Sequence, residues 1–262
     1  MSIDLLHAAL DVLSGGLVGF SLGLVGGGGS ILAVPLMVYL VGVKSPHVAI
    51  GTSALAVAAN AALGMVNHAR HDHVQWRCGL LFAGAGVAGA FAGSSAGKSV
   101  DGDQLLFLFA LVMVVVGVVM LRRRESGSRE KVVLSRDNAP QLSGFGFLTG
   151  LFAGFFGIGG GFLIVPGLIA ATDMAMIYAV GTSLVAVTAF GLTTALNYAW
   201  SGLVDWPLAG LFILGGFLGS MAGARTAKKL HSGGALTKVF SGLIFVVAAY
   251  MLWRSWAAIS AS

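Results

Sequence analysis

Charged side chains are scarce in this sequence. Asp, Glu, Lys and Arg together make up 10% of its 262 residues, whereas 57% are hydrophobic and the mean hydropathy is +0.92. A soluble domain carries about a quarter charged residues, so this chain has too few to cover a water-facing surface. The composition excludes a soluble globular protein and predicts an integral membrane protein surrounded by a lipid bilayer.

Cysteine is nearly absent as well. The single Cys78 excludes an internal disulfide framework and a cysteine-rich zinc or cluster site. Alternation of polar and apolar residues with a period of two, which is the signature of a transmembrane β-barrel, is also missing. The fold class that remains is an all-α, polytopic membrane helical bundle.

Basic residues are missing from the N-terminal segment. Residues 1–25 are apolar and contain Asp4 and Asp11 but no Lys or Arg, so they lack the basic region of a signal peptide. We expect this segment to belong to the mature bundle. The net charge of +5 comes from cations that lie between hydrophobic runs, which indicates topology determinants and not a nucleic-acid partner.

Long uncharged runs are what the sequence has in abundance. Each run of 18 residues or more without Asp, Glu, Lys or Arg can cross a hydrocarbon core roughly 30 Å thick. These runs cover residues 12–43, 45–69, 79–97, 104–121, 138–172, 174–204 and 206–224.

The chain also repeats itself. The glycine and proline positions of residues 23–35 return in residues 154–166 at an offset of 131, and Gly51-Thr52-Ser53 returns as Gly181-Thr182-Ser183 at an offset of 130. Self-similarity of this kind indicates a duplicated architecture. We predict a first membrane repeat over 1–121, a charged cytoplasmic linker over 122–141 and a second membrane repeat over 142–262.

Each half is predicted to open with a Gly-broken helix or re-entrant hairpin, followed by three spans. The segments after the glycine runs are about 12 residues long, too short to cross a bilayer alone at 1.5 Å per residue. The predicted segments are 3–25, 30–42, 47–67, 76–97 and 104–121 in the first half, and 142–156, 161–172, 175–198, 206–224 and 238–256 in the second. A first segment that crosses in full, giving eight conventional spans, stays open as an alternative.

The distribution of Lys and Arg favours an inverted-topology repeat with both termini outside. An even number of crossings in each half would divide the cations nine against six, whereas an odd number divides them twelve against three. The positive-inside rule favours the second arrangement. It leaves only Lys44, Lys98 and Arg254 on the outer side.

The two glycine runs are the first candidates for a binding site. Glycine frees the backbone from helical geometry, and the helix that follows presents unpaired N–H groups at its positive end. Two such breaks in matching positions predict a shared anion site near the bilayer midplane, with packing between helices as the alternative. The candidate residues are Gly28, Gly29, Ser30, Gly159, Gly160 and Gly161. For six later glycines we expect helix packing instead, namely Gly86, Gly89, Gly93, Gly216, Gly219 and Gly223.

Hydroxyl and amide side chains in the spans are the second group of candidates. Thr52, Ser53, Thr182 and Ser183 could cap helices or donate to an oxyanion. Asn60, Asn67 and Asn197 could hold helices together or donate to a substrate.

Titratable groups are few. His68, His71 and His73 with Asp72 form a loop cluster for which a solvated interface is the favoured interpretation and a metal site the alternative. No Glu lies inside a predicted span, and Asp173 and Asp205 lie at span ends, so we expect no dedicated buried carboxylate for proton or sodium coupling. Asp173, His47 and His68 stay open as coupling groups. Neither a phosphate loop nor a dinucleotide fingerprint is complete, so we expect no cofactor.

The repeated motifs resemble those of the sulfite exporter TauE/SafE family, also described as the toluenesulfonate uptake permease family. The matching patterns are GLVGGGGSILAVP at 23–35 with AIGTS at 49–53, and GFFGIGGGFLIVP at 154–166 with AVGTS at 179–183. The resemblance covers nearly the whole chain. It implies a multi-pass permease of the bacterial inner membrane, with seven or eight helices, that moves sulfur-containing anions such as sulfite or organosulfonates, often outward.

The residues and the resemblance lead to one hypothesis, an inner-membrane permease that exports sulfur-containing anions such as sulfite or organosulfonates by alternating access around the two glycine breaks. Substitution of Thr52 or Thr182 by Val should then abolish transport while the protein stays folded. A metal-ion or other small-anion transporter is the alternative. An intramembrane enzyme is disfavoured because the serines beside glycine lack a deep histidine or carboxylate. Small-residue faces at 86–97 and 215–223 would allow a homodimer.

Overall fold

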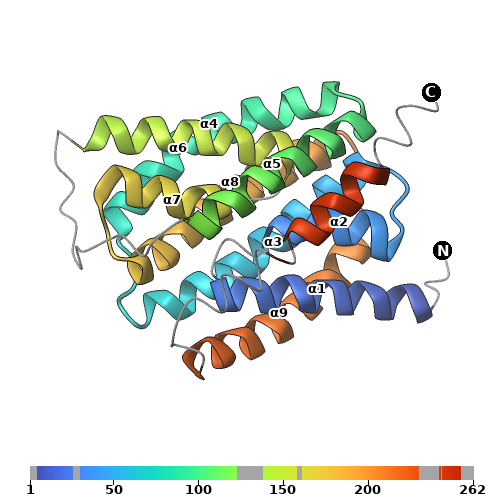
Figure 1. Cartoon of the computed structure of the whole chain (residues 1–262), viewed down its shortest axis with the longest axis horizontal. Helices are drawn as coiled ribbons and strands as arrows, with labels where there is room; N and C mark the ends of the chain where they lie inside the picture. The colour runs from blue at the N-terminus through green and yellow to red at the C-terminus, as the bar shows by residue number, and fades with distance from the viewer. Residues whose placement is uncertain are drawn as a thin grey trace.

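The computed structural model of the chain is helical (Figure 1) and describes residues 5–25, 30–122, 138–157, 161–229, 242 and 244–254. The all-α prediction is confirmed. In chain order the helices are α1 (Leu5–Val25), α2 (Ala33–Pro35), the π-helix η2 (Leu36–Val41), α3 (Pro46–Ala69), α4 (Trp76–Ser99), α5 (Gly102–Arg122), α6 (Ala139–Phe156), α7 (Gly161–Thr172), α8 (Met176–Trp200) and α9 (Trp206–Lys229), followed by a C-terminal helix (Ile244–Arg254).

Within the described residues, the helix boundaries fall within five residues of the predicted ones, whereas both bounds of the predicted segment 238–256 and most of the predicted linker 122–141 lie outside the described residues. Within the described part of the chain, four helices are long and apolar enough to cross a bilayer by themselves: α3, α4, α8 and the first 18 residues of α9. Ser30–Val41 and Leu163–Thr172 form shorter apolar helices, as the segments after the glycine runs should. The sequence predicts these boundaries because each long apolar run ends near Pro, Gly or charged residues, which lie at most of the turns.

Each glycine run separates two antiparallel helices. Leu40 of η2 lines an apolar groove together with Leu10 and Leu13 near the start of α1, so η2 runs back along α1. Gly167 of α7 faces Thr149 of α6, so α7 runs back along α6. The runs themselves, residues 26–29 and 158–160, lie outside the described residues, and so do the candidates Gly28, Gly29, Gly159 and Gly160.

Four turns use a left-handed backbone at matching positions. Gly42 (φ 85°) ends η2 and Asp173 (φ 56°) follows α7, at an offset of 131. Asp72 (φ 56°) and Gly202 (φ 69°) lie in the turns after α3 and α8, at an offset of 130. This conformation suits Gly and, among other residues, Asp and Asn best. Turns at matching sequence positions therefore share one backbone conformation.

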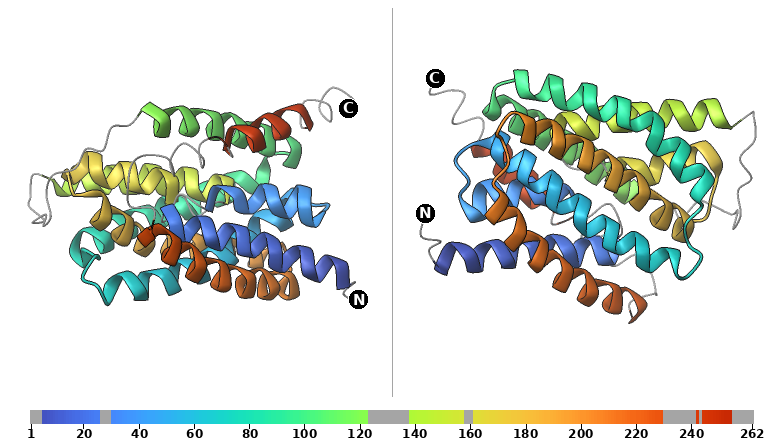
Figure 2. Two further views of the ribbon diagram at one scale, coloured as in Figure 1. Left: turned by 60° about the horizontal axis from the view of Figure 1, so that its bottom comes forward. Right: turned by 180° about the vertical axis from the view of Figure 1, so that it is seen from behind.

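Glycines bring two pairs of parallel helices into backbone contact. Gly19 of α1 faces Gly216 of α9, and Gly150 of α6 faces Gly86 of α4, so that a Cβ added to Gly19 or Gly150 would meet the backbone of the opposite helix. Figures 1 and 2 show α1 beside α9 and α4 beside α6. The packing role expected for six glycines is confirmed, since Gly86, Gly89, Gly93, Gly216, Gly219 and Gly223 all make such contacts. The glycines of these faces pack within one chain, and the homodimer stays a prediction.

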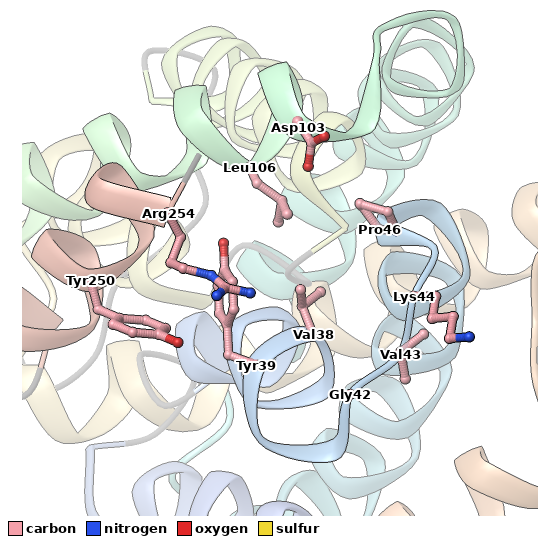
Figure 3. Close-up of a pocket in the computed structure, with 10 residues that line it drawn as sticks. All are labelled: Val38, Tyr39, Gly42, Val43, Lys44, Pro46, Asp103, Leu106, Tyr250 and Arg254. Carbon is pink, nitrogen blue, oxygen red and sulfur yellow. The ribbon is translucent and has the colours of Figure 1, made fainter. Parts of the chain in front are cut away.

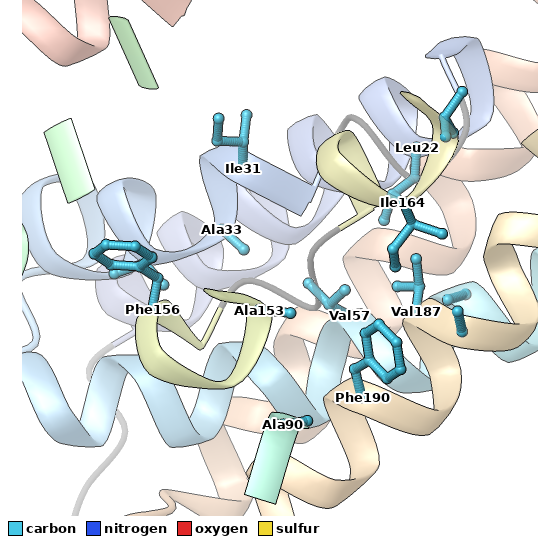
Figure 4. Close-up of a cluster of buried hydrophobic side chains, with 14 of the residues drawn as sticks. Leu22, Ile31, Ala33, Val57, Ala90, Ala153, Phe156, Ile164, Val187 and Phe190 are labelled. Carbon is cyan, nitrogen blue, oxygen red and sulfur yellow. The ribbon is translucent and has the colours of Figure 1, made fainter. Parts of the chain in front are cut away.

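Helices α3 and α8 cross the middle of the bundle in opposite directions. Gly51 packs on Tyr198, Gly64 faces Leu184 and Gly191 faces Ala58. Residues early in α3 therefore lie beside residues late in α8. Figure 4 shows one buried apolar cluster around this pair, to which the segments on both sides of the glycine runs contribute Ala33, Phe156 and Ile164.

Candidate functional site

The two Gly-Thr-Ser motifs make matching hydrogen bonds across the molecule. The hydroxyl of Thr52, in α3, accepts a hydrogen bond of 3.0 Å from the backbone N–H of Asp205, just before α9. The hydroxyl of Thr182, in α8, accepts one of 2.9 Å from the backbone N–H of Gln75, just before α4. Both threonines are fully buried. Each therefore holds the entry of a helix that belongs to the other half of the chain.

The threonines differ from the neighbouring serines in whether the hydroxyl proton is already used in a hydrogen bond. Ser53 donates to the carbonyl of Ile50 at 3.1 Å and Ser183 to the carbonyl of Val180 at 2.7 Å, so their only proton is already used. Within the described part of the chain, Thr52 and Thr182 only accept, and a hydroxyl can donate at the same time. The threonines, and not the serines, are thus suited to bind an anion.

Thr52 and Thr182 lie at opposite ends of the bundle. Gly51, next to Thr52, packs on Tyr198, which lies well over four turns from Thr182 along α8. At 1.5 Å per residue this separates the two hydroxyls by on the order of 20 Å. The structure therefore does not bring them together around one small anion.

The ends of the glycine runs are buried. Gly157, which ends α6 in a left-handed conformation, packs on Ile50, so the second glycine run begins close to the first Gly-Thr-Ser motif. Ser30 and Gly161, the first described residues after the two runs, are both buried. The backbone that follows each run is therefore shielded from the outer surface of the bundle.

Asn60 is the candidate whose side chain is least explained by folding. It lies slightly past the middle of α3, is 3% exposed and packs against Gly216 of α9. In the part of the chain that the structure describes, neither its amide nitrogen nor its amide oxygen has a hydrogen-bond partner. Ser14 in α1 and Thr194 in α8 are likewise buried with unpartnered hydroxyls, and the sequence analysis missed both. Buried polar groups are nearly always paired, so such groups indicate a place for a bound ion or water.

Asn197 joins two helices. Its amide nitrogen donates to Ser94 at 2.6 Å and Ser95 at 3.0 Å, and its side-chain oxygen accepts from the Lys98 ammonium at 2.8 Å. Lys98 also donates to the Asn197 carbonyl at 3.1 Å and to Ser201 at 3.0 Å. The interhelical alternative therefore accounts for both amide hydrogens of Asn197 and for one hydrogen bond to its side-chain oxygen. Asn67, at the matching place in α3, is exposed, and its carbonyl accepts from His71 Nδ1 at 2.9 Å.

The histidines of the turn after α3 lie near one another without forming a ligand set. Ring centroids are 5.7 Å apart for His68 and His73 and 6.0 Å for His71 and His73, the latter pair being stacked. Among the described residues, no group of three or more His, Cys, Asp or Glu side chains is placed to hold a metal ion. The rings pack on each other and on Tyr178, 6.0 Å from His73.

One carboxylate is buried inside a helix. Asp11 of α1 is 4% exposed and lies on the same helix face as Ser14 and Val18. The prediction that no buried carboxylate is present is therefore wrong for α1, because an isolated Asp in an apolar run does not reveal which helix face it occupies. Asp205 has a local role, since its Oδ1 accepts from the backbone N–H of Leu208 at 3.1 Å at the start of α9.

A cavity of about 590 Å³ opens at one end of the bundle, and the sequence analysis missed it. Figure 3 shows its lining, which comes from η2 and the following turn, the starts of α3 and α5, and the C-terminal helix. It contains Lys44, Asp103 and Arg254 but none of the predicted site residues. No local motif reveals such a cavity, because its walls come from segments up to two hundred residues apart.

Comparison with known proteins identifies the family. The family profile described as "Sulfite exporter TauE/SafE" matches residues 12–251. A "Probable membrane transporter protein" of Xylella fastidiosa (strain 9a5c) is 52% identical over 252 residues, which cover 95% of this chain and 96% of that protein.

More distant relatives carry the same description. The probable membrane transporter protein YdhB of Bacillus subtilis is 26% identical, covering 88% of this chain and 96% of its own, and one from Methanocaldococcus jannaschii is 26% identical, covering 95% and 96%. No solved structure gives a significant match. The chain belongs to the sulfite exporter TauE/SafE family and is a multi-pass membrane transporter, not an enzyme.

Proposed function

We propose that this protein exports a sulfur-containing anion, such as sulfite or an organosulfonate, across the bacterial inner membrane by alternating access. The observation that carries the proposal is the Asn60 amide, which is buried near the middle of a spanning helix without a hydrogen-bond partner among the described residues. An unpartnered amide at that depth costs about 1–3 kcal/mol, which a bound oxyanion would offset.

The chemistry of the candidate donors matches such a cargo. A sulfite or sulfonate spreads its negative charge over three oxygens, which neutral N–H and O–H groups can bind weakly enough to release. The Asn60 amide and the hydroxyls of Thr52 and Thr182 are donors of this kind. Among the described residues no Lys or Arg is fully buried, so no deep cation would retain a dianion.

An inverted-topology repeat explains how one anion could reach both sides. Two observations support it. Thr52 accepts a hydrogen bond from Asp205 just as Thr182 accepts one from Gln75, and α3 and α8 run antiparallel. Equivalent residues also meet in one buried cluster, including Val57 with Val187 (Figure 4). Each half then consists of a hairpin, which enters and returns on the same side, and three further helices that cross. The number of crossings in each half is therefore odd, as the distribution of cations predicts.

In this scheme the anion meets its donors in succession. Thr52 lies near the end of the bundle where α3 begins, Asn60 near the middle and Thr182 near the opposite end. The backbone N–H group of Gly161, directly after the second glycine run, would add to the site from its hairpin. Movement of one half against the other would open the path to each side in turn. Asn197, Ser53 and Ser183 take structural roles in this scheme.

The test measures transport by purified protein in liposomes, with sulfite, sulfoacetate, an aryl sulfonate, sulfate and a divalent metal ion as separate cargoes. Asn60→Leu should abolish sulfonate or sulfite flux while thermal stability stays equal or rises, because it removes a buried unpaired amide. Asn60→Asp should abolish flux through repulsion of the anion. Leu192→Ala, at an exposed position of α8, serves as a control that should leave flux unchanged.

Two results would overturn the proposal. Normal flux in both Asn60 variants would show that the site lies elsewhere. Flux of the metal ion, with none of the sulfur oxyanions carried, would favour the metal-ion alternative instead.

A further inference from the structure

The cavity at the end of the bundle has features of a binding site separate from the Asn60 region. Its walls come from the segment 38–46, the start of α5 and the C-terminal helix, three parts of the chain that only the fold brings together. A volume of about 590 Å³ is in the range of pockets that hold organic ligands and is much larger than a bare oxyanion needs.

The cavity collects positive charge on a face that has little of it. Under the favoured topology only Lys44, Lys98 and Arg254 lie on the outer side. Lys98 is engaged by Asn197 and Ser201, whereas Lys44 and Arg254 both line the cavity. In the described part of the chain, neither of these two cations has a carboxylate within 4 Å. With the carboxylate of Asp103 on the opposite wall, the lining carries a net charge of +1, which suits a monoanion.

The rest of the lining is aromatic and aliphatic. Tyr39 and Tyr250 meet edge to face, with ring centroids 5.2 Å apart, and Val38 and Leu106 contribute apolar surface. Figure 3 shows the Arg254 guanidinium and the Tyr39 ring extending into the space between the segments, while Lys44 lies at the rim with its ammonium directed away from the other labelled side chains. A rigid guanidinium beside aromatic rings binds a planar or tetrahedral oxyanion with an apolar body.

We propose that this cavity binds an amphiphilic monoanion, in which a sulfonate, carboxylate or phosphate head is attached to an apolar body. Arg254 holds the head, Lys44 attracts it from the rim, and the two tyrosine rings contact the body. This site would bind the monoanion at the end of the bundle, and the proposal does not depend on the proposed transport path. The same chemistry could come from a soluble organic anion or from the headgroup of an anionic lipid, and the experiment distinguishes these sources.

The experiment uses the full-length protein in neutral detergent and measures binding of 2-naphthalenesulfonate by titration calorimetry. Inorganic sulfate supplies the head without the body, and 2-naphthalenemethanol supplies the body without the charge. Wild-type protein should bind 2-naphthalenesulfonate at least about ten-fold more tightly than either partial probe. Arg254→Gln should weaken that binding about ten-fold, as expected for the loss of one charged hydrogen bond. Lys44→Gln should weaken it less, mainly through the association rate.

A matched control tests whether the position of the cation matters. Arg70→Gln removes an exposed cation at the turn after α3, so it should leave 2-naphthalenesulfonate binding unchanged. A second arm measures by native mass spectrometry how much phosphatidylglycerol the protein retains. Retention lost in Arg254→Gln, with no binding of the soluble sulfonate, would assign the site to a lipid headgroup.

Equal binding of 2-naphthalenesulfonate by wild type and Arg254→Gln, with equal lipid retention, would overturn the proposal. If instead binding depends on Arg254 but no sulfur oxyanion is transported by wild type, the cavity assignment stands and the proposed transport function fails.

Discussion

The hydroxyl of Thr52 accepts a hydrogen bond from the backbone N–H of Asp205, 153 residues further along the chain, and Thr182 accepts the matching bond from Gln75. Each threonine therefore supports the start of a helix in the other half. Any motion of one half against the other acts directly on these two contacts, which makes them the natural places to test how the halves are held.

Removal of either threonine hydroxyl should lower stability. Thr52→Val and Thr182→Val each remove the hydroxyl that accepts from a half-buried backbone N–H, and the loss of one such hydrogen bond costs about 0.5–1.5 kcal/mol. Thr52→Ser and Thr182→Ser keep the acceptor and should lose much less. Thermal unfolding in detergent measures the difference. If both Val variants were as stable as the wild type, the structural role would be contradicted, and binding of the anion would be the remaining role for these threonines.

Cys78 should act as a built-in reporter of unfolding. It is the only cysteine in the sequence and is 1% exposed in α4. A thiol-reactive dye should therefore label the folded protein slowly and react rapidly at the unfolding temperature. Fluorescence during a thermal ramp checks this. Fast labelling at room temperature would mean that α4 packs less tightly than the structure shows.

The glycine contacts give a matched pair in one helix. A Cβ at Gly89 would meet the carbonyl of Phe147 in α6, whereas a Cβ at Gly84 would meet nothing within 4 Å. Gly89→Ala should destabilise by about 1–3 kcal/mol through overpacking. Gly84→Ala should leave stability unchanged or raise it by up to about 1 kcal/mol through helix propensity. Equal unfolding temperatures for the two variants would argue against close packing of α4 on α6.

Lys98 and Asn197 should be energetically coupled. The ammonium donates to both the side-chain and the backbone oxygen of Asn197, so each single substitution removes shared bonds. A double-mutant cycle with Lys98→Met and Asn197→Leu should give a coupling of about 0.5–3 kcal/mol. Lys44→Met, at an exposed cation, provides the comparison and should not couple to Asn197. Additive effects of the first pair would show that the network contributes little.

The left-handed turns allow a test that involves no packing. Gly202 (φ 69°) has open space around its Cβ position, so Gly202→Ala should destabilise by about 1 kcal/mol purely through backbone strain. Asp72 has the matching left-handed conformation after α3. Asp72→Gly should not destabilise the protein, because Gly adopts a positive φ without strain. Thermal unfolding of the two variants should therefore shift differently, and a loss of stability in Asp72→Gly alone would contradict the assignment.

Local patterns were sufficient for the helices but only partly for the site. The boundaries of α3, α4, α8 and α9 follow from hydropathy and from the residues at their ends, and the packing role of Gly86 or Gly219 follows from spacing along one helix. Of the predicted site residues, Thr52, Thr182 and Asn60 keep donors that an anion could use. Ser53, Ser183 and Asn197 use theirs within the fold, and Asn67 is exposed.

What the sequence by itself determined is a helical membrane protein, because hydropathy is a property of single segments, and its repeated motifs predict two similar halves. Only the tertiary structure decided that Thr52 pairs with Asp205, that Asn60 has no partner among the described residues, that Asp11 is buried, and that Lys44 and Arg254 share a cavity. Each of these facts depends on contacts between segments far apart in the chain. Such contacts are set by how the helices cross, which no local pattern encodes.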